Sequence, residues 1–166
     1  RKMYAVIYLN NYWQWSGGMA QYMNWSKGDS ISDADGDFKR MMRYSARFYA
    51  DAAANEIFRN YVKMIVNRTN TYSRLKYKND PAIMAWELAN EPRPGPDGED
   101  GEKNIEDFIT WNHTTSSWIH SIDPNHLVTT GSEGIMGCIQ KEEYFLKTLN
   151  DPSIDFATFH LWAKNW

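Results

Sequence analysis

The sequence lacks several features that would place it in other functional classes. It has one cysteine, Cys138, so it can form neither an internal disulfide nor a metal site with two cysteine ligands. Its formal net charge of −3 at pH 7 leaves no excess of basic residues for nucleic-acid binding. No apolar run approaches the ~20 residues of a membrane span. We therefore expect no nucleic-acid partner and no membrane partner.

The sequence also lacks a secretion signal and a phosphate-binding loop. Residues 1–9 contain a short apolar stretch without a cleavage site, and they resemble a buried strand more than a signal peptide. No Gly-rich loop follows any expected strand, which weakens a nucleotide-binding interpretation. Both ends of the sequence look like interrupted elements. We therefore expect a piece of a larger domain, whose ends give no information on secretion.

Aromatic residues are the unusual part of the composition. They make up 15% of the 166 residues and include eight tryptophans and ten tyrosines. A chain of this length can form one domain with a hydrophobic core, and most of these rings are explained by ordinary core packing. The remainder are suited to a cleft, because flat rings stack on the apolar faces of sugars.

Strands and helices are expected to alternate along the chain. Apolar runs predict strands at residues 3–9, 83–89, 126–130 and 154–160. Helical periodicity predicts helices within residues 37–67 with a break near Asp51, and at residues 105–122 and 142–149. Residues 10–37 and 92–101 are expected to be loops. This alternation indicates parallel βαβ units. The nearly continuous apolar run at residues 3–9 is typical of a parallel strand covered on both faces.

Polar side chains follow the expected strands at their C-terminal ends. They are Asn10 and Asn11, Asn90 and Glu91, Ser132 and Glu133, and His160. In a (β/α)8 barrel the C-terminal ends of the strands carry the chemistry, although open α/β sheets also bind ligands there. A barrel needs about 250 residues, so this chain would form only part of one.

Glu91 is the strongest candidate for a catalytic group. It ends the apolar strand of residues 83–89 and is followed by Pro92. A carboxyl group in a buried position is costly unless it is paired or has a task, and shielding from water favours the neutral form that a general acid needs. Strand alternation places Asn90 and Glu91 on opposite faces, so the strand must distort near Pro92 if both serve one site. The alternative is a structural carboxylate that caps a loop or pairs with Arg93.

The string Trp-Glu-Leu-Ala-Asn-Glu-Pro-Arg at residues 86–93 resembles the acid/base motif of retaining glycosidases in glycoside hydrolase family 5, of clan A. It is most similar to strand four of the endo-β-1,4-mannanases. Residues 9–25, 121–134 and 154–160 resemble, in this order, the strand-three loop, strand five and strand six of these enzymes. The resemblance implies a (β/α)8 TIM barrel. Residues 1–166 would be the central part of a single catalytic domain, truncated at both ends and covering strands three to six.

The resemblance also implies a role for individual residues. Glu91 would be the general acid and then the general base, Asn90 would bond the sugar 2-hydroxyl, and His160 would contact the catalytic carboxylates. Trp162 stands where many relatives have tyrosine, so it can stack but cannot donate a phenolic hydrogen bond. Alternatives remain: a core histidine for His160, a turn cap for Glu133 and a loop anchor for Trp13. The residues expected to bind substrate are Arg93, Glu133, Trp162, Trp13 and Asn10.

The second catalytic carboxylate is expected outside this chain. A retaining glycosidase needs two carboxyl groups about 5 to 5.5 Å apart. The resemblance places the nucleophile at the end of strand seven, and Glu133 is not expected to replace it. We expect the isolated chain to be inactive. No metal or other cofactor is expected, because the other histidines lack metal-site spacing and the acidic residues at 29–37 are better explained as a solvated loop.

The expected function is that of a secreted endo-β-1,4-mannanase, monomeric as the full-length enzyme. It would hydrolyse internal bonds of mannan, glucomannan or galactomannan with retention of configuration. Two alternatives remain open. One is a cellulase or another β-glycanase of the same family, and the other is a barrel that binds polysaccharide without cleaving it.

Overall fold

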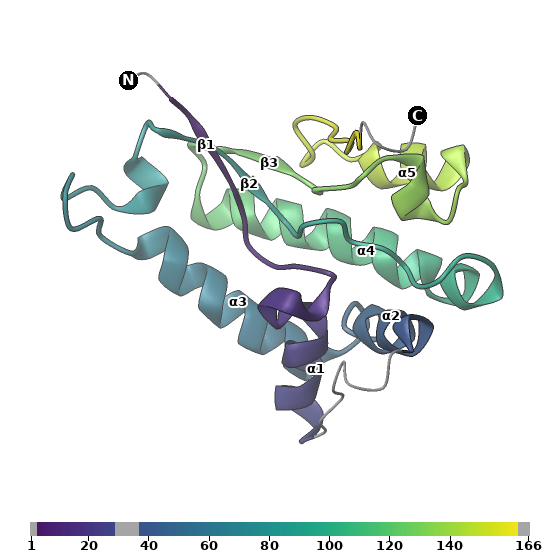
Figure 1. Cartoon of the computed structure of the whole chain (residues 1–166). Coiled ribbons are helices and arrows are strands. Elements are labelled where there is room, and N and C mark those ends of the chain that lie inside the picture. Colours follow the sequence, from purple (N-terminus) through teal and green to yellow (C-terminus); the bar gives the residue numbers. More distant parts are fainter. Residues whose placement is uncertain (1–2, 29–36, 163–166) are drawn as a thin grey trace.

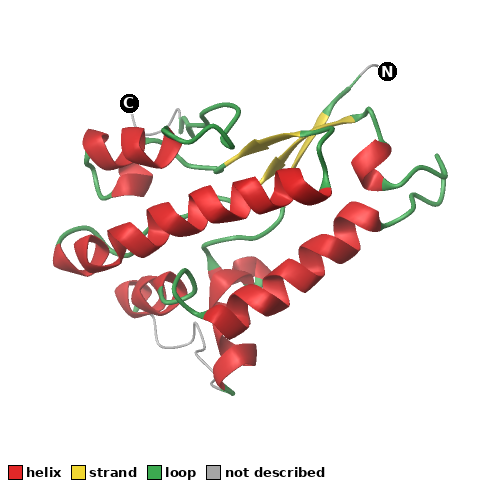
Figure 2. Cartoon of the chain, turned by 180° about the vertical axis from the view of Figure 1, so that it is seen from behind, coloured by secondary structure: helices red, strands yellow, loops and turns green. Residues whose placement is uncertain are grey.

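The computed structural model describes residues 3–28 and 37–162 and contains a three-stranded sheet with helices packed against it. The strands are β1 (Ala5–Tyr8), β2 (Ile83–Glu87) and β3 (Leu127–Thr129). The helices are α1 (Gly18–Lys27), α2 (Phe38–Ala46), α3 (Ala52–Asn67), α4 (Glu99–Ile122) and α5 (Glu142–Leu149). Helices α3 and α4 run along the same side of the sheet (Figures 1 and 2).

The sheet is parallel, as the βαβ alternation predicts. Its order is β1-β2-β3, and Tyr8, Glu87 and Thr129 lie opposite one another across the three strands. Backbone pairing continues past the end of β2, because Leu88 N–H donates to the Thr129 carbonyl over 2.9 Å. The strand ends are thereby held side by side at the edge where the polar residues cluster.

The edge strand β1 is more exposed than expected. Val6 is 43% exposed and Tyr8 53%, whereas Ala85 and Trp86 in the central strand are fully buried. Ala5 is also exposed and Ile7 is half-buried, so in the described residues both faces of β1 are reached by solvent. The expectation that this strand is covered on both faces is therefore wrong for the described part of the chain.

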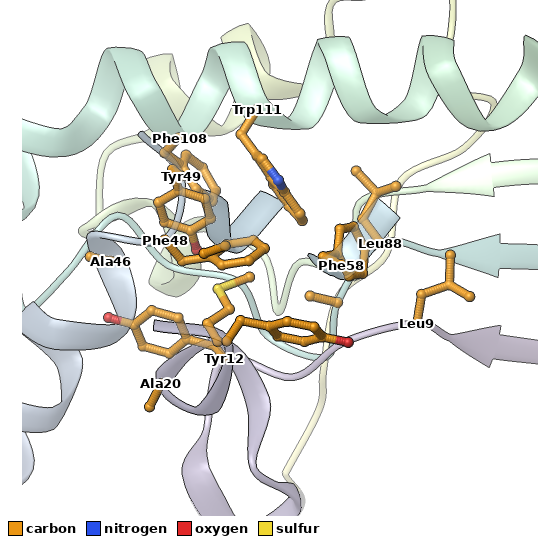
Figure 3. Close-up of a cluster of buried hydrophobic side chains, with 14 of the residues drawn as sticks. Leu9, Tyr12, Ala20, Ala46, Phe48, Tyr49, Phe58, Leu88, Phe108 and Trp111 are labelled. Carbon is orange, nitrogen blue, oxygen red and sulfur yellow. The ribbon is translucent and has the colours of Figure 1, made fainter. Parts of the chain in front are cut away.

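The core between the helices is rich in aromatic rings (Figure 3). The ring centroid of Phe48 lies 5.8 Å from that of Phe58 and 5.7 Å from that of Trp111, in edge-to-face contacts that aromatic rings prefer.

Asp51 caps α3 by accepting a hydrogen bond from Ala54 N–H over 2.8 Å. The predicted break near Asp51 is therefore confirmed.

Two helices differ from the sequence prediction. Helix α1 forms within the segment expected to be a loop, because Gly18 enters it at a positive φ and Met19 and Met23 pack into the core. Helix α4 begins at Glu99 rather than at Ile105, and its first turn carries acidic residues that favour a helix N-terminus. Among the helices of the described residues, none is long and apolar enough to cross a membrane.

The segment at residues 154–160 is not a strand, which corrects the prediction. It runs beside β3, where Asp155 N–H donates to the Val128 carbonyl over 2.9 Å. The next contact is a side-chain bond from Thr129 Oγ1 to the Phe156 carbonyl over 2.8 Å. Because side-chain bonds replace part of the backbone ladder, the segment follows β3 without forming regular pairing.

Candidate active site

The backbone distorts at Glu91, at the end of the extension of β2. Glu91 has a φ of +50°, a left-handed conformation that is uncommon for a residue other than glycine. Its N–H donates to the Gly131 carbonyl over 3.0 Å, which ties the turn to the end of β3. The distortion expected near Pro92 lies at Glu91 itself. Such conformations concentrate at functional sites, where the surrounding structure holds them.

The carboxyl group of Glu91 is held by two side chains from distant parts of the chain. Trp13 Nε1 donates to Oε2 over 2.6 Å, and His160 Nδ1 lies 2.6 Å from Oε1. The Glu91 side chain is only 12% exposed. The indole N–H can only donate, whereas the histidine nitrogen donates or accepts according to its tautomer. Oε1 can therefore be ionised or carry a proton without losing its partner, and general acid and base chemistry needs both states.

Asn90 lies beside the end of β1. Its Nδ2 donates to Asn11 Oδ1 over 3.3 Å, and its backbone N–H donates to the Asn10 carbonyl over 3.0 Å. Asn10 is 5% exposed, and its Oδ1 accepts the Asn11 N–H over 2.8 Å. The structure thus brings the predicted residues Asn10 and Asn90 together. Asn10 is fixed against the loop backbone, and within the described residues its Nδ2 has no partner.

Arg93 and Glu133 form an ion pair next to Glu91. Arg93 Nε lies 2.5 Å from Glu133 Oε1, and both side chains are largely buried. The alternative in which Arg93 pairs with Glu91 is not what the structure has. The Arg93 guanidinium also lies over the Trp13 ring, 5.2 Å from its centroid. Glu133 is thus occupied by Arg93.

Trp13 is buried within an aromatic stack. It is 5% exposed, and the rings of Trp15 and Phe38 stack on it with centroids 5.4 and 5.1 Å away. Trp15 is 65% exposed. This geometry matches the loop-anchor alternative for Trp13. Its hydrogen bond to Glu91 spans 78 residues of sequence and has no local signal in the chain.

His160 and Trp162 follow the irregular segment beside β3. The His160 N–H donates to the Glu133 carbonyl over 3.4 Å, which brings the ring toward Glu91. Trp162 is 65% exposed, so its ring is open to solvent in the described part of the chain. The predicted residues Glu91, Glu133 and His160 therefore lie together.

Glu87 is a further carboxylate at this end of the sheet, and we assigned it no role from the sequence. A Cβ atom at Gly131, which has a φ of +79°, would lie 2.5 Å from Glu87 Cγ and 1.9 Å from the Ala89 carbonyl oxygen. Gly131 thus leaves the space that the Glu87 side chain fills. Burial raises the pKa of Glu87, His160 lowers it and Glu91 raises it, with a net increase. The sequence feature that could have identified Glu87 is strand alternation, which places Glu87 and Glu91 on the same face of the strand.

In the described residues, no group of His, Cys, Asp and Glu side chains could hold a metal ion. Asp29, Asp33 and Asp35 of the acidic segment lie outside those residues, and Asp37 caps α2 by accepting the Arg40 N–H over 2.9 Å. His126 is buried against Asp123. The polar groups assembled near Glu91 are suited to proton transfer and to binding hydroxyl groups.

Comparisons with known proteins show what the chain is similar to. A family model described as "GH family 5 beta-mannosidase-like" matches residues 1–166. The mannan endo-1,4-beta-mannosidase 7 of Arabidopsis thaliana is 34% identical over 177 residues, covering 97% of this chain and 36% of the relative. The mannan endo-1,4-beta-mannosidase 8 of Oryza sativa subsp. japonica is 31% identical, covering 99% of this chain and 44% of the relative.

Solved structures give the same result. The glycoside hydrolase family 5 mannosidase of Rhizomucor miehei matches with a TM-score of 0.81 and 34% identity, covering 99% of this chain and 37% of that one. The endo-beta-1,4-mannanase of Thermotoga petrophila matches with a TM-score of 0.78 and 32% identity, covering 98% of this chain and 34% of that one. The chain thus spans less than half the length of each of these four proteins.

Proposed function

The chain belongs to the glycoside hydrolase family 5 β-mannosidase-like family, and from this we propose that it is part of a retaining endo-β-1,4-mannanase. The structural neighbours are TIM-barrel enzymes, so the parallel sheet and its helices form part of a (β/α)8 barrel, as predicted. The observation that carries the proposal is the Glu91 carboxyl group, held between Trp13 and His160 at the C-terminal end of the strands.

Glu91 is proposed to transfer protons in both halves of the reaction. In the first half it donates a proton to the leaving glycosidic oxygen while a second carboxylate attacks the sugar. In the second half it takes a proton from the water that hydrolyses the covalent intermediate. Trp13 N–H stabilises the carboxylate after the proton has left, since a hydrogen bond to an ionised acceptor is a strong one. His160 Nδ1 is proposed to accept a hydrogen bond from Glu91 Oε1 when this oxygen carries the proton, and to donate one when the carboxylate is ionised.

The neighbouring polar residues are proposed to bind the sugar. Asn90 precedes Glu91 and is proposed to hydrogen-bond the sugar 2-hydroxyl, as the family resemblance implies. Arg93 and Glu133 are proposed to line the leaving-group side, where the pair presents a donor and an acceptor to hydroxyl groups. Asn10, Trp162 and the Trp13 loop are proposed to complete the sugar-binding surface.

The nucleophile is proposed to come from a part of the parent protein outside residues 1–166. The chain spans 34 to 45% of the solved family members that it matches. Within the chain, Glu133 forms an ion pair with Arg93, and the Glu87 side chain packs against Gly131. We therefore expect the isolated 166-residue chain to lack hydrolytic activity.

The proposed substrate is a β-mannan, with plain mannan, glucomannan and galactomannan as the candidates. The relatives at 31–34% identity are named as mannan endo-1,4-β-mannosidases. A polysaccharide cannot cross a membrane, so we propose that the parent enzyme is secreted. A monomer is proposed because the candidate acid/base and its partners come from one chain.

Initial rates of the parent enzyme on mannan, glucomannan, galactomannan and carboxymethylcellulose test the proposal. We expect hydrolysis of the mannans, with the β-anomer formed first in a proton NMR time course. Hydrolysis of carboxymethylcellulose alone would make the parent a cellulase. Binding of mannan without hydrolysis would make it a non-catalytic barrel. The control is Glu106→Gln, which alters an exposed carboxylate on α4 and should leave the rates unchanged.

A further inference from the structure

Three Asn-x-Ser/Thr tripeptides occur in the chain, and none belongs to the proposed active site. They are Asn24-Trp25-Ser26, Asn67-Arg68-Thr69 and Asn112-His113-Thr114. In secreted proteins this tripeptide is the acceptor for an N-linked glycan, which is bulky and must lie on the surface. The sequence does not distinguish the three tripeptides, but the structure does.

Asn112 is incompatible with a glycan. It lies in the middle of α4 and is 0% exposed. Its Nδ2, the atom that would carry the sugar, donates to the Phe108 carbonyl over 2.8 Å within the core. A sugar at this atom would break the bond and would need space that a packed interior does not have. A chain glycosylated at Asn112 could not adopt this fold.

Asn24 is also poorly placed. Its tripeptide lies within α1, and its Oδ1 accepts a hydrogen bond from Tyr44 of α2 over 3.0 Å. Ser26 is engaged as well, because its hydroxyl donates to the Met23 carbonyl over 3.1 Å. Asn24 is half-buried between two packed helices, so a glycan there would disturb their contact.

Asn67 has the surroundings that a glycan requires. It is the last residue of α3, and the chain leaves the helix at Arg68 in an extended conformation with a ψ of 133°. Asn67, Arg68 and Thr69 are all exposed. Asn67 Nδ2 makes one exposed hydrogen bond, to the Lys63 carbonyl at the end of the helix. Losing that bond costs little, since water can replace it.

The position of Asn67 also separates it from the proposed active site. Helix α3 runs back from the C-terminal ends of the strands, and its last turn lies near the N-terminal end of the sheet (Figure 1). Glu91 lies at the opposite end of the strands. A glycan at Asn67 would project into solvent without reaching the sugar-binding surface.

We propose that Asn67 carries an N-linked glycan when the parent protein passes through a secretory pathway that attaches one. The donor is a lipid-linked oligosaccharide diphosphate. A bond forms between Asn67 Nδ2 and the anomeric carbon of the first sugar as the bond from that carbon to the diphosphate oxygen breaks. The diphosphate leaves with the electron pair, and Nδ2 loses one proton. Asn112 and Asn24 remain without sugar in the folded protein.

Expression of the full-length parent in a yeast secretory host tests the proposal. The secreted protein is treated with an amidase that removes N-glycans in ¹⁸O-labelled water, and peptide mass spectrometry identifies each asparagine converted to labelled aspartate. We expect the label at Asn67 in most molecules and none at Asn112 or Asn24. An unlabelled Asn67, or label at Asn112 or Asn24, would overturn the proposal.

Two matched variants make the assignment independent of folding. Thr69→Ala removes the tripeptide while leaving Asn67 in place, and it should abolish the glycan mass at this position. Thr114→Ala disrupts the buried tripeptide at an exposed side chain and should leave the total glycan mass unchanged. Turnover on mannan should be the same for wild type and Thr69→Ala, because Thr69 lies outside the proposed active site. Loss of glycan mass in Thr114→Ala would refute the proposal.

Discussion

Strand β2 has a cluster of tryptophan, carboxylate and histidine near each end, and in both clusters an indole Nε1 and an imidazole Nδ1 contact the carboxylate. At the C-terminal end the carboxylate is Glu91. At the other cluster it is Asp123, whose Oδ2 accepts Trp86 Nε1 over 2.7 Å and lies 2.7 Å from His126 Nδ1. The distances at Glu91 are both 2.6 Å. Donor type and distance therefore do not distinguish a site for chemistry from a structural one.

The two clusters differ in access and in backbone conformation. The Asp123 side chain is 0% exposed, and its other oxygen accepts the Asn125 N–H over 3.0 Å. His126 is also buried, and its second ring nitrogen, Nε2, lies 3.1 Å from the Asp80 carbonyl oxygen. Glu91 is partly exposed and sits on a left-handed residue. Both oxygens of each carboxylate have a partner, but only the Glu91 side chain is reached by solvent. We therefore interpret the closed Asp123 cluster as structural and the Glu91 cluster as the one that can exchange a proton with a ligand.

The largest expected effect is on turnover at the open cluster. Glu91→Gln in the parent enzyme should reduce kcat on mannan by about 10²- to 10⁴-fold, because the amide cannot donate or accept the transferred proton. KM and the urea midpoint of unfolding should change little. Steady-state kinetics and urea denaturation measure these quantities, with Glu106→Gln as the control. Undiminished kcat in Glu91→Gln would remove Glu91 from the mechanism.

The closed cluster should respond in stability instead. Asp123→Ala leaves the buried Trp86 Nε1 and His126 Nδ1 without their partner, and we expect it to lower the free energy of unfolding by about 3 to 5 kcal/mol. At temperatures where the variant stays folded, kcat per folded molecule should remain near the wild-type value. A large fall in kcat with an unchanged urea midpoint would contradict the structural assignment.

The two tryptophans form a matched pair. Trp13→Phe removes the N–H that bonds Glu91, and we expect kcat to fall about 10- to 100-fold, because a hydrogen bond to a charged group contributes about 1.5 to 3 kcal/mol. Trp86→Phe should lower the free energy of unfolding by a similar amount and leave kcat nearly unchanged. Equal effects of the two variants on stability and on kcat would erase the distinction between the clusters.

The smallest expected effect concerns Glu87 and pH. Burial is the main cause that raises its folded-state pKa above the ordinary value. At a pH between the unfolded-state and the folded-state pKa, the folded protein keeps the Glu87 proton that the unfolded chain has lost. The contribution of Glu87 to stability is therefore fully present below the unfolded-state pKa and is lost as pH rises through the folded-state pKa. Gln does not ionise, so Glu87→Gln should lack this loss of stability. The urea midpoint of unfolding of the variant should therefore rise relative to that of the wild type as pH increases. Parallel curves for the two proteins would contradict this.

Much of the fold could be predicted because its elements have local signals. Apolar runs marked the three strands, and helical periodicity marked α2, α3 and α5. The missed elements depend on contacts made elsewhere: α1 forms where Met19 and Met23 reach the core. The strand expected at residues 154–160 was wrong because side-chain bonds replace part of its backbone pairing with β3.

The site was predictable where strand order brings residues together. Glu91, Glu133 and His160 follow strands or segments that end at one edge of the sheet, and they do meet there. The contact of Trp13 with Glu91 depends on the path of a loop, which no periodic pattern encodes. Asp123 and His126 are only three residues apart in sequence, but the bond from Trp86 to Asp123 spans 37 residues and has no local signal.

The central claim is that Glu91 is the acid/base. Its most direct test is how the rate of formation of the covalent glycosyl-enzyme intermediate depends on the leaving group. The pre-steady-state burst of the parent enzyme and of Glu91→Gln would be measured on aryl β-mannobiosides whose phenols differ in acidity. The variant should approach the wild-type burst rate with the most acidic phenol and fall far behind with the least acidic, because a good leaving group needs no proton. A loss of equal size for every phenol would contradict the account.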